Sequence, residues 1–325
     1  LLRHRLPASQ RHAAVSSVGE GPSSAPLLRA TLLIVLSACC FGSIAPLTVI
    51  ATGHGMALES VQAWRYTTSA VLLVAVGWWR GAPLRRGVTP WFAPHILLVA
   101  GGGQATIATL ALLSLQWIPT ATASFLFYTF PAWVAVITAI RGIERLARTR
   151  VTALLLALGG IGFMVGAPSA ASLNPLGVAA VLAAALAYAL YIPILGSLQR
   201  QREAIDVSRA IAVGGAVLFV GWAVVTGTLF RIPDGVAFGA SALQGVLSAV
   251  SFLAFLAGLR VLGPVRTAIT STVEPFWTTM LGLVLLRQSV GTGTLIGGVA
   301  IMGAVLLLQR PAGAHRPAHS SAADP

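Results

Sequence analysis

Ten apolar stretches follow one another between Ala30 and Gln309, with only short breaks between them. A helix rises about 1.5 Å per residue and a bilayer core is about 30 Å thick, so roughly 20 apolar residues cross it once. A helix also satisfies its own backbone hydrogen bonds, which lipid cannot do. The pattern predicts an all-α membrane protein with ten transmembrane helices. They are expected at Ala30–Ile50, Ser60–Trp79, Trp91–Trp117, Ala121–Ile140, Val151–Ala167, Pro175–Ser197, Ala210–Leu229, Val236–Leu259, Val265–Leu286 and Gly291–Gln309.

The charges indicate how these helices are oriented. Hydrophobic residues make up 56% of the chain and charged residues 9%, with a net charge of +13. All 21 basic residues are arginines, and most lie in the segments that would share one side of the membrane with the N-terminus. Positive loops stay in the cytoplasm, so both termini of this multi-pass protein are expected inside a plasma (inner) membrane. Because the positive net charge is explained by this orientation in the membrane, no nucleic-acid partner is expected.

An internal repeat divides the chain into two halves. A shift of 144 residues aligns Pro131 with Pro275, each followed two residues later by Trp, and aligns Arg65 with Arg209. Each half holds five predicted spans, an odd number, so the second half must be inverted relative to the first. Inverted repeats build a site near the midplane that opens alternately to each side. The predicted repeats cover 30–168 and 169–310, flanked by cytoplasmic tails at 1–29 and 311–325 whose composition is typical of disorder.

Several short motifs resemble those of EamA-type drug/metabolite transporters, which have ten helices in two five-helix repeats. They are Phe41-Gly42 where that family often has Trp-Gly, Arg65, Pro131, Glu274-Pro275, and Gly142-Ile143-Glu144-Arg145-Leu146, which resembles Gly-Glu-Arg-Leu with one residue inserted. One departure is clear, because the second half has Arg287-Gln288 where the family usually repeats Gly-Glu. The resemblance implies a secondary carrier of a small organic solute.

Span nine carries the strongest functional signal. Thr267, Thr270, Ser271, Glu274 and Thr278 follow a helical spacing that would place them on one face. Glu274 lies about ten residues into the span, near the midplane, where a carboxylate is costly and marks a functional site by default. It can bind a substrate amine or carry a proton that couples transport to the proton gradient. A structural carboxylate bonded to nearby hydroxyls or an arginine is the alternative.

Other polar and aromatic residues would complete a central cavity. The expected walls are apolar on span four and polar on span nine, which suits an amphiphilic solute such as an amino acid or an organic cation. The further candidates are Phe127, Tyr128, Tyr188, Tyr191, Gln104, Gln244 and Ser248. Bonding between helices is at least as good an explanation for the buried amides. Proline interrupts a helix, so spans four and nine should kink at Pro131 and Pro275.

Two further expectations concern the periphery. Arg65 lies near the outer end of span two, so the default expectation is that it extends to the outer surface. The alternative is that it lines the outer vestibule and attracts anions. Glycines crowd spans five and ten, which predicts close helix packing, with a contact for a second copy of the chain as one outcome.

The preferred function is therefore alternating-access transport, with export as the expected direction and proton coupling as an option. The chain has no Lys and no phosphate-binding loop, so direct use of ATP is not expected. A polytopic membrane enzyme would need converging catalytic groups, and neither these nor metal spacings emerge. A non-transporting scaffold would gain nothing from Glu274. No cofactor or metal is expected, and the partners are a small solute and the bilayer.

Overall fold

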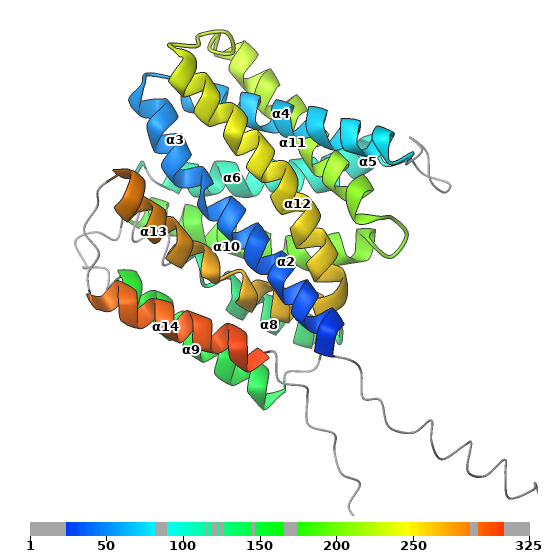
Figure 1. The fold of residues 1–325 in the computed structure, drawn as a ribbon, viewed down its shortest axis with the longest axis vertical. Helices are drawn as coiled ribbons and strands as arrows, with labels where there is room; N and C mark the ends of the chain where they lie inside the picture. The colour runs from blue at the N-terminus through cyan, green and yellow to red at the C-terminus, as the bar shows by residue number, and fades with distance from the viewer. Residues whose placement is uncertain are drawn as a thin grey trace, which may run out of the picture.

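The computed structural model describes residues 24–81, 90–114, 116–118, 123, 126–144, 147–165, 174–286 and 292–308. Every regular element in these ranges is a helix (Figure 1). The elements are α2 (Ser24–Gly42), α3 (Ile44–Gly53), α4 (Leu58–Trp79), α5 (Pro94–Leu97), the π-helix η1 (Leu98–Gly102), α6 (Gly103–Ser114), α8 (Phe130–Ile140), α9 (Arg148–Val165), α10 (Pro175–Leu198), α11 (Ala204–Val225), α12 (Gly235–Thr270), α13 (Val273–Leu286) and α14 (Thr292–Leu308). The all-helical class predicted from the sequence is confirmed.

Five helical stretches among the described residues are long and apolar enough to cross a membrane. They are Ala25–Gly53, Pro94–Ser114, Pro175–Leu198, Ala204–Val225 and Gly235–Thr270. The other helices are shorter or more polar: α13 and α14 have 14 and 17 residues, and α4 carries Glu59 and Arg65. The chain is thus a multi-helix membrane protein, and its count of ten spans stays a prediction. The expected tails lie outside the described residues, except that α2 begins at Ser24.

The predicted boundary between spans eight and nine is a sharp kink. The label α12 covers two helices between Gly235 and Thr270, which meet at the non-helical residue Gly263, with φ 75° and ψ 170°. Gly263 adopts this left-handed conformation without a Cβ penalty, and Pro264 after it cannot extend the preceding hydrogen-bond ladder. The chain therefore turns sharply here without a loop.

Glycines allow α11 to pack directly against the π-helix η1. A Cβ added to Gly101 would lie 2.4 Å from Cα of Gly214, and one added to Gly214 would lie 2.5 Å from the Leu97 carbonyl oxygen. The neighbouring backbones leave no room for a side chain. The hydroxyl of Tyr191 on α10 donates to the carbonyl of Ala100, one of the backbone groups in this irregular turn.

Replacing Gly101 with Ala should therefore destabilise the protein, because a methyl group would collide with rigid backbone rather than with a movable side chain. Overpacking of this kind costs about 1–3 kcal/mol. Gly102→Ala is the matched control, since its Cβ would only come within 3.3 Å of the Leu98 Cδ1 methyl. Thermal unfolding in detergent should show a lower melting temperature for Gly101→Ala alone. Equal melting of both variants would contradict the packing described here.

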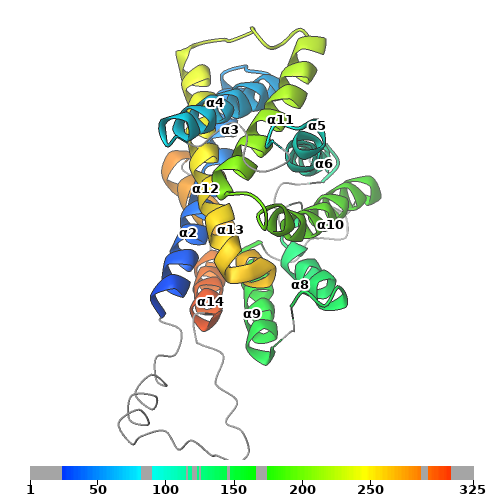
Figure 2. The ribbon, with the colours of Figure 1, turned by 90° about the vertical axis from the view of Figure 1, so that its right-hand side faces the viewer.

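The glycine-rich helices α9 and α14 pack against each other. Figures 1 and 2 both place them side by side at one end of the bundle. A Cβ on Gly160 would lie 2.8 Å from the Gly297 carbonyl oxygen, and one on Gly293 would lie 2.4 Å from the Phe163 carbonyl oxygen. Small residues thus bring the last helices of the two repeats together, as expected from their composition.

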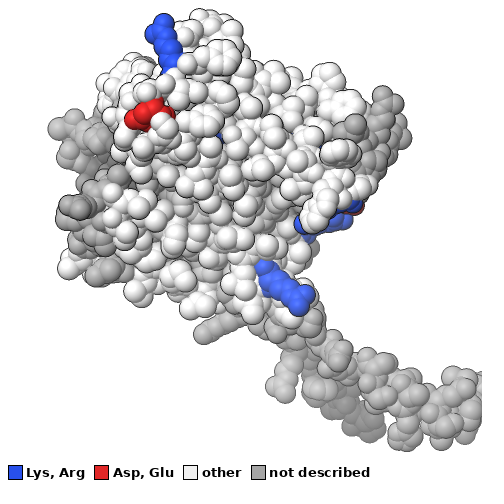
Figure 3. All heavy atoms as spheres, turned by 45° about the horizontal axis from the view of Figure 1, so that its top comes forward, with Lys and Arg blue, Asp and Glu red and all other residues white. Residues whose placement is uncertain are grey.

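The face of the molecule in Figure 3 is almost free of charge. The few arginine and acidic side chains visible on it lie toward its edges. A broad uncharged surface of this kind fits contact with lipid, whereas a soluble protein would expose mixed charges.

Candidate functional site

Glu274 lies where a membrane helix is interrupted. The last part of α12 ends at Thr270, Ser271 and Thr272 form a turn, and α13 begins at Val273, so Glu274 is in its first turn. The Glu274 amide donates to the Ser271 carbonyl at 3.0 Å, and Pro275 follows. The single continuous face expected for span nine is therefore wrong, because the break separates Thr267 and Thr270 from Glu274 and Thr278. An acid in the first turn of a helix is favourably placed relative to the helix dipole.

Another membrane helix lies directly against this break. Ser43, between α2 and α3, has helical torsions and its amide donates to the Cys39 carbonyl at 3.1 Å, so Ala25–Gly53 is one helical stretch. Trp277 Nε1 donates to Ser43 Oγ at 3.0 Å. Thr278 Oγ1 donates to the Gly42 carbonyl at 2.9 Å. Only glycine fits at position 42, since a Cβ would lie 2.9 Å from the Glu274 carbonyl oxygen. Carriers built from inverted repeats typically form their sites at interrupted helices.

Four side chains from four different parts of the chain interact with the Glu274 carboxylate. The hydroxyl of Tyr128, in the turn before α8, donates a hydrogen bond to it. The positive charge of Arg65 on α4 attracts it through space. Tyr188 on α10 and Cys39 on α2 are close enough for an electrostatic interaction with its negative charge. Glu274 is itself only partly buried. The structure thus brings together the acid and two of the predicted tyrosines.

Arg65 does not extend to the outer surface, so the default expectation for it is wrong. Its side chain is buried, with Nε donating to Ser248 Oγ at 2.8 Å and Nη1 donating to Gln62 Oε1 at 3.1 Å. It also lies over the ring of Tyr66, 5.0 Å from the centroid. These contacts turn the guanidinium toward the interior, where Glu274 lies.

The repeat-related arginine, Arg209, has a different partner. Gln62 and Asp206 occupy equivalent positions under the shift of 144 residues, each three residues before its arginine. Arg209 Nη1 donates to Asp206 Oδ1 at 3.3 Å, and both side chains are fully buried. The second-half arginine is therefore neutralised by a neighbouring acid. In the first half the neighbour is an uncharged amide, which leaves the Arg65 charge available to act on Glu274.

Aromatic rings lie beside the acid. Phe127 stacks on Tyr188 with ring centroids 5.8 Å apart and an interplanar angle of 15°, and Phe130 lies 4.7 Å from the same tyrosine. Phe127 and Tyr188 are partly buried. These rings form an apolar cluster around Tyr188, which interacts with Glu274. The uneven central cavity stays a prediction.

Several predicted site residues have structural partners instead. Gln244 Oε1 accepts from Thr48 Oγ1 at 3.2 Å, Ser248 accepts from Arg65, and both residues are fully buried between helices. Ser271 Oγ donates to the Thr267 carbonyl at 2.9 Å. Tyr191 is held by Ala100, and its ring packs against the backbone at Gly103. Their participation in a site, and that of Thr267, Thr270, Thr278 and Gln104, stays a prediction.

The predicted kinks take the form of breaks. Pro131 lies in the first turn of α8, so no described helix continues through it. Pro275 lies in the first turn of α13. Proline is well tolerated at such positions because the first amides of a helix have no intrahelical partner. Both prolines thus begin helices rather than bend them.

Sequence reasoning left Arg65, Gln62 and Cys39 out of the site. The signal for the first two was present: the repeat pairs Arg65 with Arg209, and the position three residues earlier changes from Gln to Asp. Nothing in the sequence pointed to Cys39. Among the described residues, no group of three His, Cys, Asp or Glu side chains could hold a metal ion.

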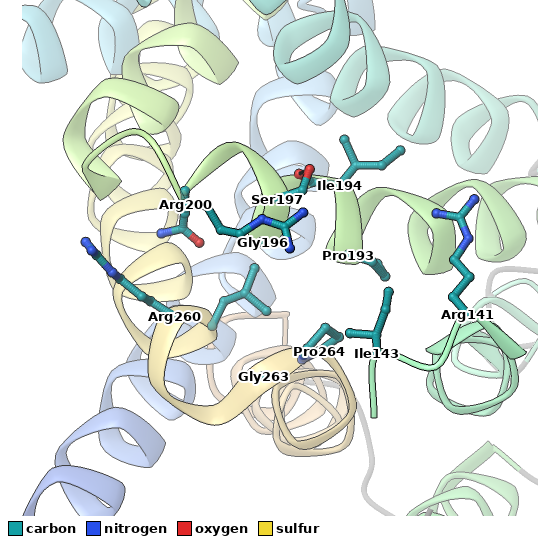
Figure 4. Close-up of a pocket in the computed structure, with 12 residues that line it drawn as sticks. Arg141, Ile143, Pro193, Ile194, Gly196, Ser197, Arg200, Arg260, Gly263 and Pro264 are labelled. Atoms are coloured by element: carbon teal, nitrogen blue, oxygen red, sulfur yellow. Dashed lines mark hydrogen bonds between the residues drawn. The ribbon is translucent and has the colours of Figure 1, made fainter. Parts of the chain in front are cut away.

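A hollow of about 500 Å³ lies apart from this cluster, around the sharp turn of α12 (Figure 4). Three arginines line it, Arg141 after α8, Arg200 after α10 and Arg260 on α12, and in Figure 4 Arg200 lies between the other two. The rest of the lining is Ile143, Pro193, Ile194, Gly196, Ser197, Gln199, Leu259, Gly263 and Pro264. No predicted site residue lines this hollow.

Comparison with known proteins identifies the class. The EamA-like transporter family model matches residues 28–166 and 175–310, one match for each predicted repeat. The chain belongs to this family of membrane transporters, as its motifs suggested.

Two further comparisons agree with this result. YicL of Salmonella typhimurium, described as an uncharacterized inner membrane transporter, is 26% identical over 230 residues, which cover 66% of this chain and 73% of that protein. A solved crystal structure matches with a TM-score of 0.74 at 22% identity, covering 86% of this chain and 97% of the other. The second likeness shows a shared fold.

Proposed function

We propose that this chain is a secondary carrier that exports a small organic metabolite by alternating access. One observation carries the proposal: a buried arginine and an intramembrane acid interact through space at the break between α12 and α13. Arg65 donates hydrogen bonds to Ser248 and Gln62, and its interaction with Glu274 acts through space. Both charged groups can therefore bind parts of a solute. Intramembrane charges of this kind mark solute and ion pathways.

The same geometry favours a solute with both polar and apolar parts. Glu274 offers a carboxylate to an amine, and Arg65 offers a guanidinium to a carboxylate. Phe127 and Tyr188 offer stacked rings to an apolar group. An amino acid or a related amphiphilic compound would satisfy all three. A simple organic cation would use Glu274 and the rings but not Arg65.

Proton coupling fits the same acid. Glu274 can release a proton when a cationic solute binds and take it up again after the solute leaves, which links the two movements. Tyr128 is placed to hold the carboxylate through this exchange, because its hydroxyl donates to the ionised form. Inward movement of protons would then drive outward movement of solute.

The arginine distribution supports an orientation with both termini in the cytoplasm, and the name of the Salmonella relative supports an inner membrane location. In this orientation the arginine-lined hollow of Figure 4 faces the cytoplasm. A solute leaving the cell would meet that side first.

Purified protein in liposomes tests the proposal directly. Protein-containing vesicles loaded with a mixture of radiolabelled amino acids and amphiphilic cations should lose at least one of these solutes faster than equally loaded vesicles without the protein. The efflux is measured at two external pH values. Loss without dependence on pH would remove proton coupling and keep the carrier. No loss of any solute, together with turnover of a lipid, would instead favour a membrane enzyme. No flux and no turnover would favour a scaffold.

A further inference from the structure

Glu144, which belongs to the motif Gly-Ile-Glu-Arg-Leu that resembles the Gly-Glu-Arg-Leu of the family, lies at a contact between the two repeats. It follows α8 in the first repeat, yet its Oε1 accepts from the Val265 amide of the second repeat at 3.3 Å. Val265 is the residue after Pro264, where the second segment of α12 begins. Glu144 therefore caps a helix start that belongs to the other repeat, and a carboxylate is the favoured partner for such amides.

The second repeat is shaped to receive this carboxylate. Gly263 lies directly beside the carboxylate, since a Cβ on it would lie 2.5 Å from Glu144 Oε1, and its positive φ favours glycine at this position. Arg150, near the start of α9, donates a hydrogen bond to the other carboxylate oxygen of Glu144, Oε2, and forms an ion pair with it. Gly263 also lines the arginine-rich hollow of Figure 4, so the contact borders that hollow.

The contact lies at the base of the segment that leads to the site. Val265–Thr270 connects this cap to the break at Ser271–Thr272, and Glu274 follows within the next turn. A movement that frees the Val265 amide from Glu144 would therefore shift the element carrying Glu274. The cap can couple opening at this end of the protein to the site.

The surroundings of Glu144 change the pKa of its carboxyl group. Burial raises the pKa of Glu144, and Arg150, the Val265 amide and Arg266 together only partly lower it. A folded-state pKa above the unfolded value means that ionisation disfavours folding at pH values above the unfolded pKa. Glu144→Gln, which removes the buried charge, should therefore fold as well as the wild type.

We propose that Glu144 is a latch between the repeats, which holds the arginine-rich end of the carrier closed and must release Val265 for that end to open. The proposal rests on the alternating-access function given above. Glu144 does not touch the solute in this account; it positions the helix segment that carries the site.

The test uses a single cysteine at the break, Ser271→Cys, with Cys39→Ser and Cys40→Ser. Ser271 is 5% exposed, so a membrane-impermeant maleimide should label it slowly. Adding Glu144→Ala should raise labelling from the arginine-rich side at least about ten-fold. A ten-fold change corresponds to about 1.4 kcal/mol, which is less than a hydrogen bond to a charged group typically contributes. Glu144→Gln should give a smaller rise, because its amide oxygen still accepts from Val265 but Arg150 is lost.

Two controls separate a latch from general loosening. Asp234→Asn alters a cap at the other end of α12, where Asp234 bonds His54 and the Ala237 amide, and should leave labelling from the arginine-rich side unchanged. A cysteine at Ser208, which is 0% exposed on α11, should stay unlabelled in Glu144→Ala. Labelling of both reporters would show loosening and overturn the proposal.

The labelling needs no transported solute, so it tests the latch separately from the proposed function. Wild-type labelling in Glu144→Ala would overturn the latch even where the protein exports a solute normally. Faster labelling only from the opposite side would overturn it as well. Where a solute is known, Glu144→Ala should also change its maximal transport rate.

Discussion

Glu274→Gln should reduce solute transport by at least about ten-fold, because the amide keeps the shape of the side chain but cannot pair with a cation or exchange a proton. Any remaining flux should no longer depend on the pH gradient. The structure gives the physical reason: Glu274 occupies a helix break, with the Tyr128 hydroxyl donating to it and Arg65 acting on it through space. Flux from proteoliposomes at two pH values measures both effects.

Glu59→Gln provides the matched control for this variant. Glu59 lies in the first turn of α4 and accepts from Thr228 Oγ1 at 3.2 Å, away from the cluster around Glu274. The same exchange of acid for amide there should leave transport intact. Normal, still pH-dependent transport in Glu274→Gln would remove this acid from the mechanism.

Asp206→Ala should lower the melting temperature strongly, by roughly 10 °C, since removing one member of a buried ion pair costs about 3–5 kcal/mol. Asp206 is 2% exposed and Arg209 is 1% exposed, so the remaining cation has little access to water. Gln62→Ala at the equivalent position of the first repeat removes only a neutral partner. Its melting temperature should change little, whereas its effect on Arg65 should alter transport.

A double variant completes this comparison. Asp206→Ala with Arg209→Met removes both charges, and replacing a buried pair by apolar groups is often neutral. It should recover most of the stability lost in the single variant. Thermal unfolding in detergent measures each protein. Equal stability of Asp206→Ala and the wild type would show that Arg209 does not depend on its acid.

The residues of the candidate site were only partly predictable from the sequence. Glu274 stood out because a carboxylate inside an apolar span is rare and costly. Tyr128 was predicted as a hydroxyl just off the apolar face of span four, and Tyr188 was predicted together with Tyr191, three residues later in span six. Arg65 was assigned to the surface, because distance along a helix from its end says nothing about which neighbours cover it. Ser248, on a helix nearly two hundred residues away, provides the contact that turns it inward.

The sequence by itself determined the helical class, the membrane setting and the two-repeat organisation. These depend on the length and spacing of apolar segments, which the energetics of lipid fix locally. It also identified the family that the comparison confirmed.

Only the tertiary structure decided where the helices break and which distant groups meet there. The helix that begins after the turn at Ser271–Thr272 contacts Ser43, and Glu144 of one repeat caps Val265 of the other. Such contacts join segments more than a hundred residues apart. Their energies come from packing and hydrogen bonds between whole helices, and no local pattern in either segment encodes its partner.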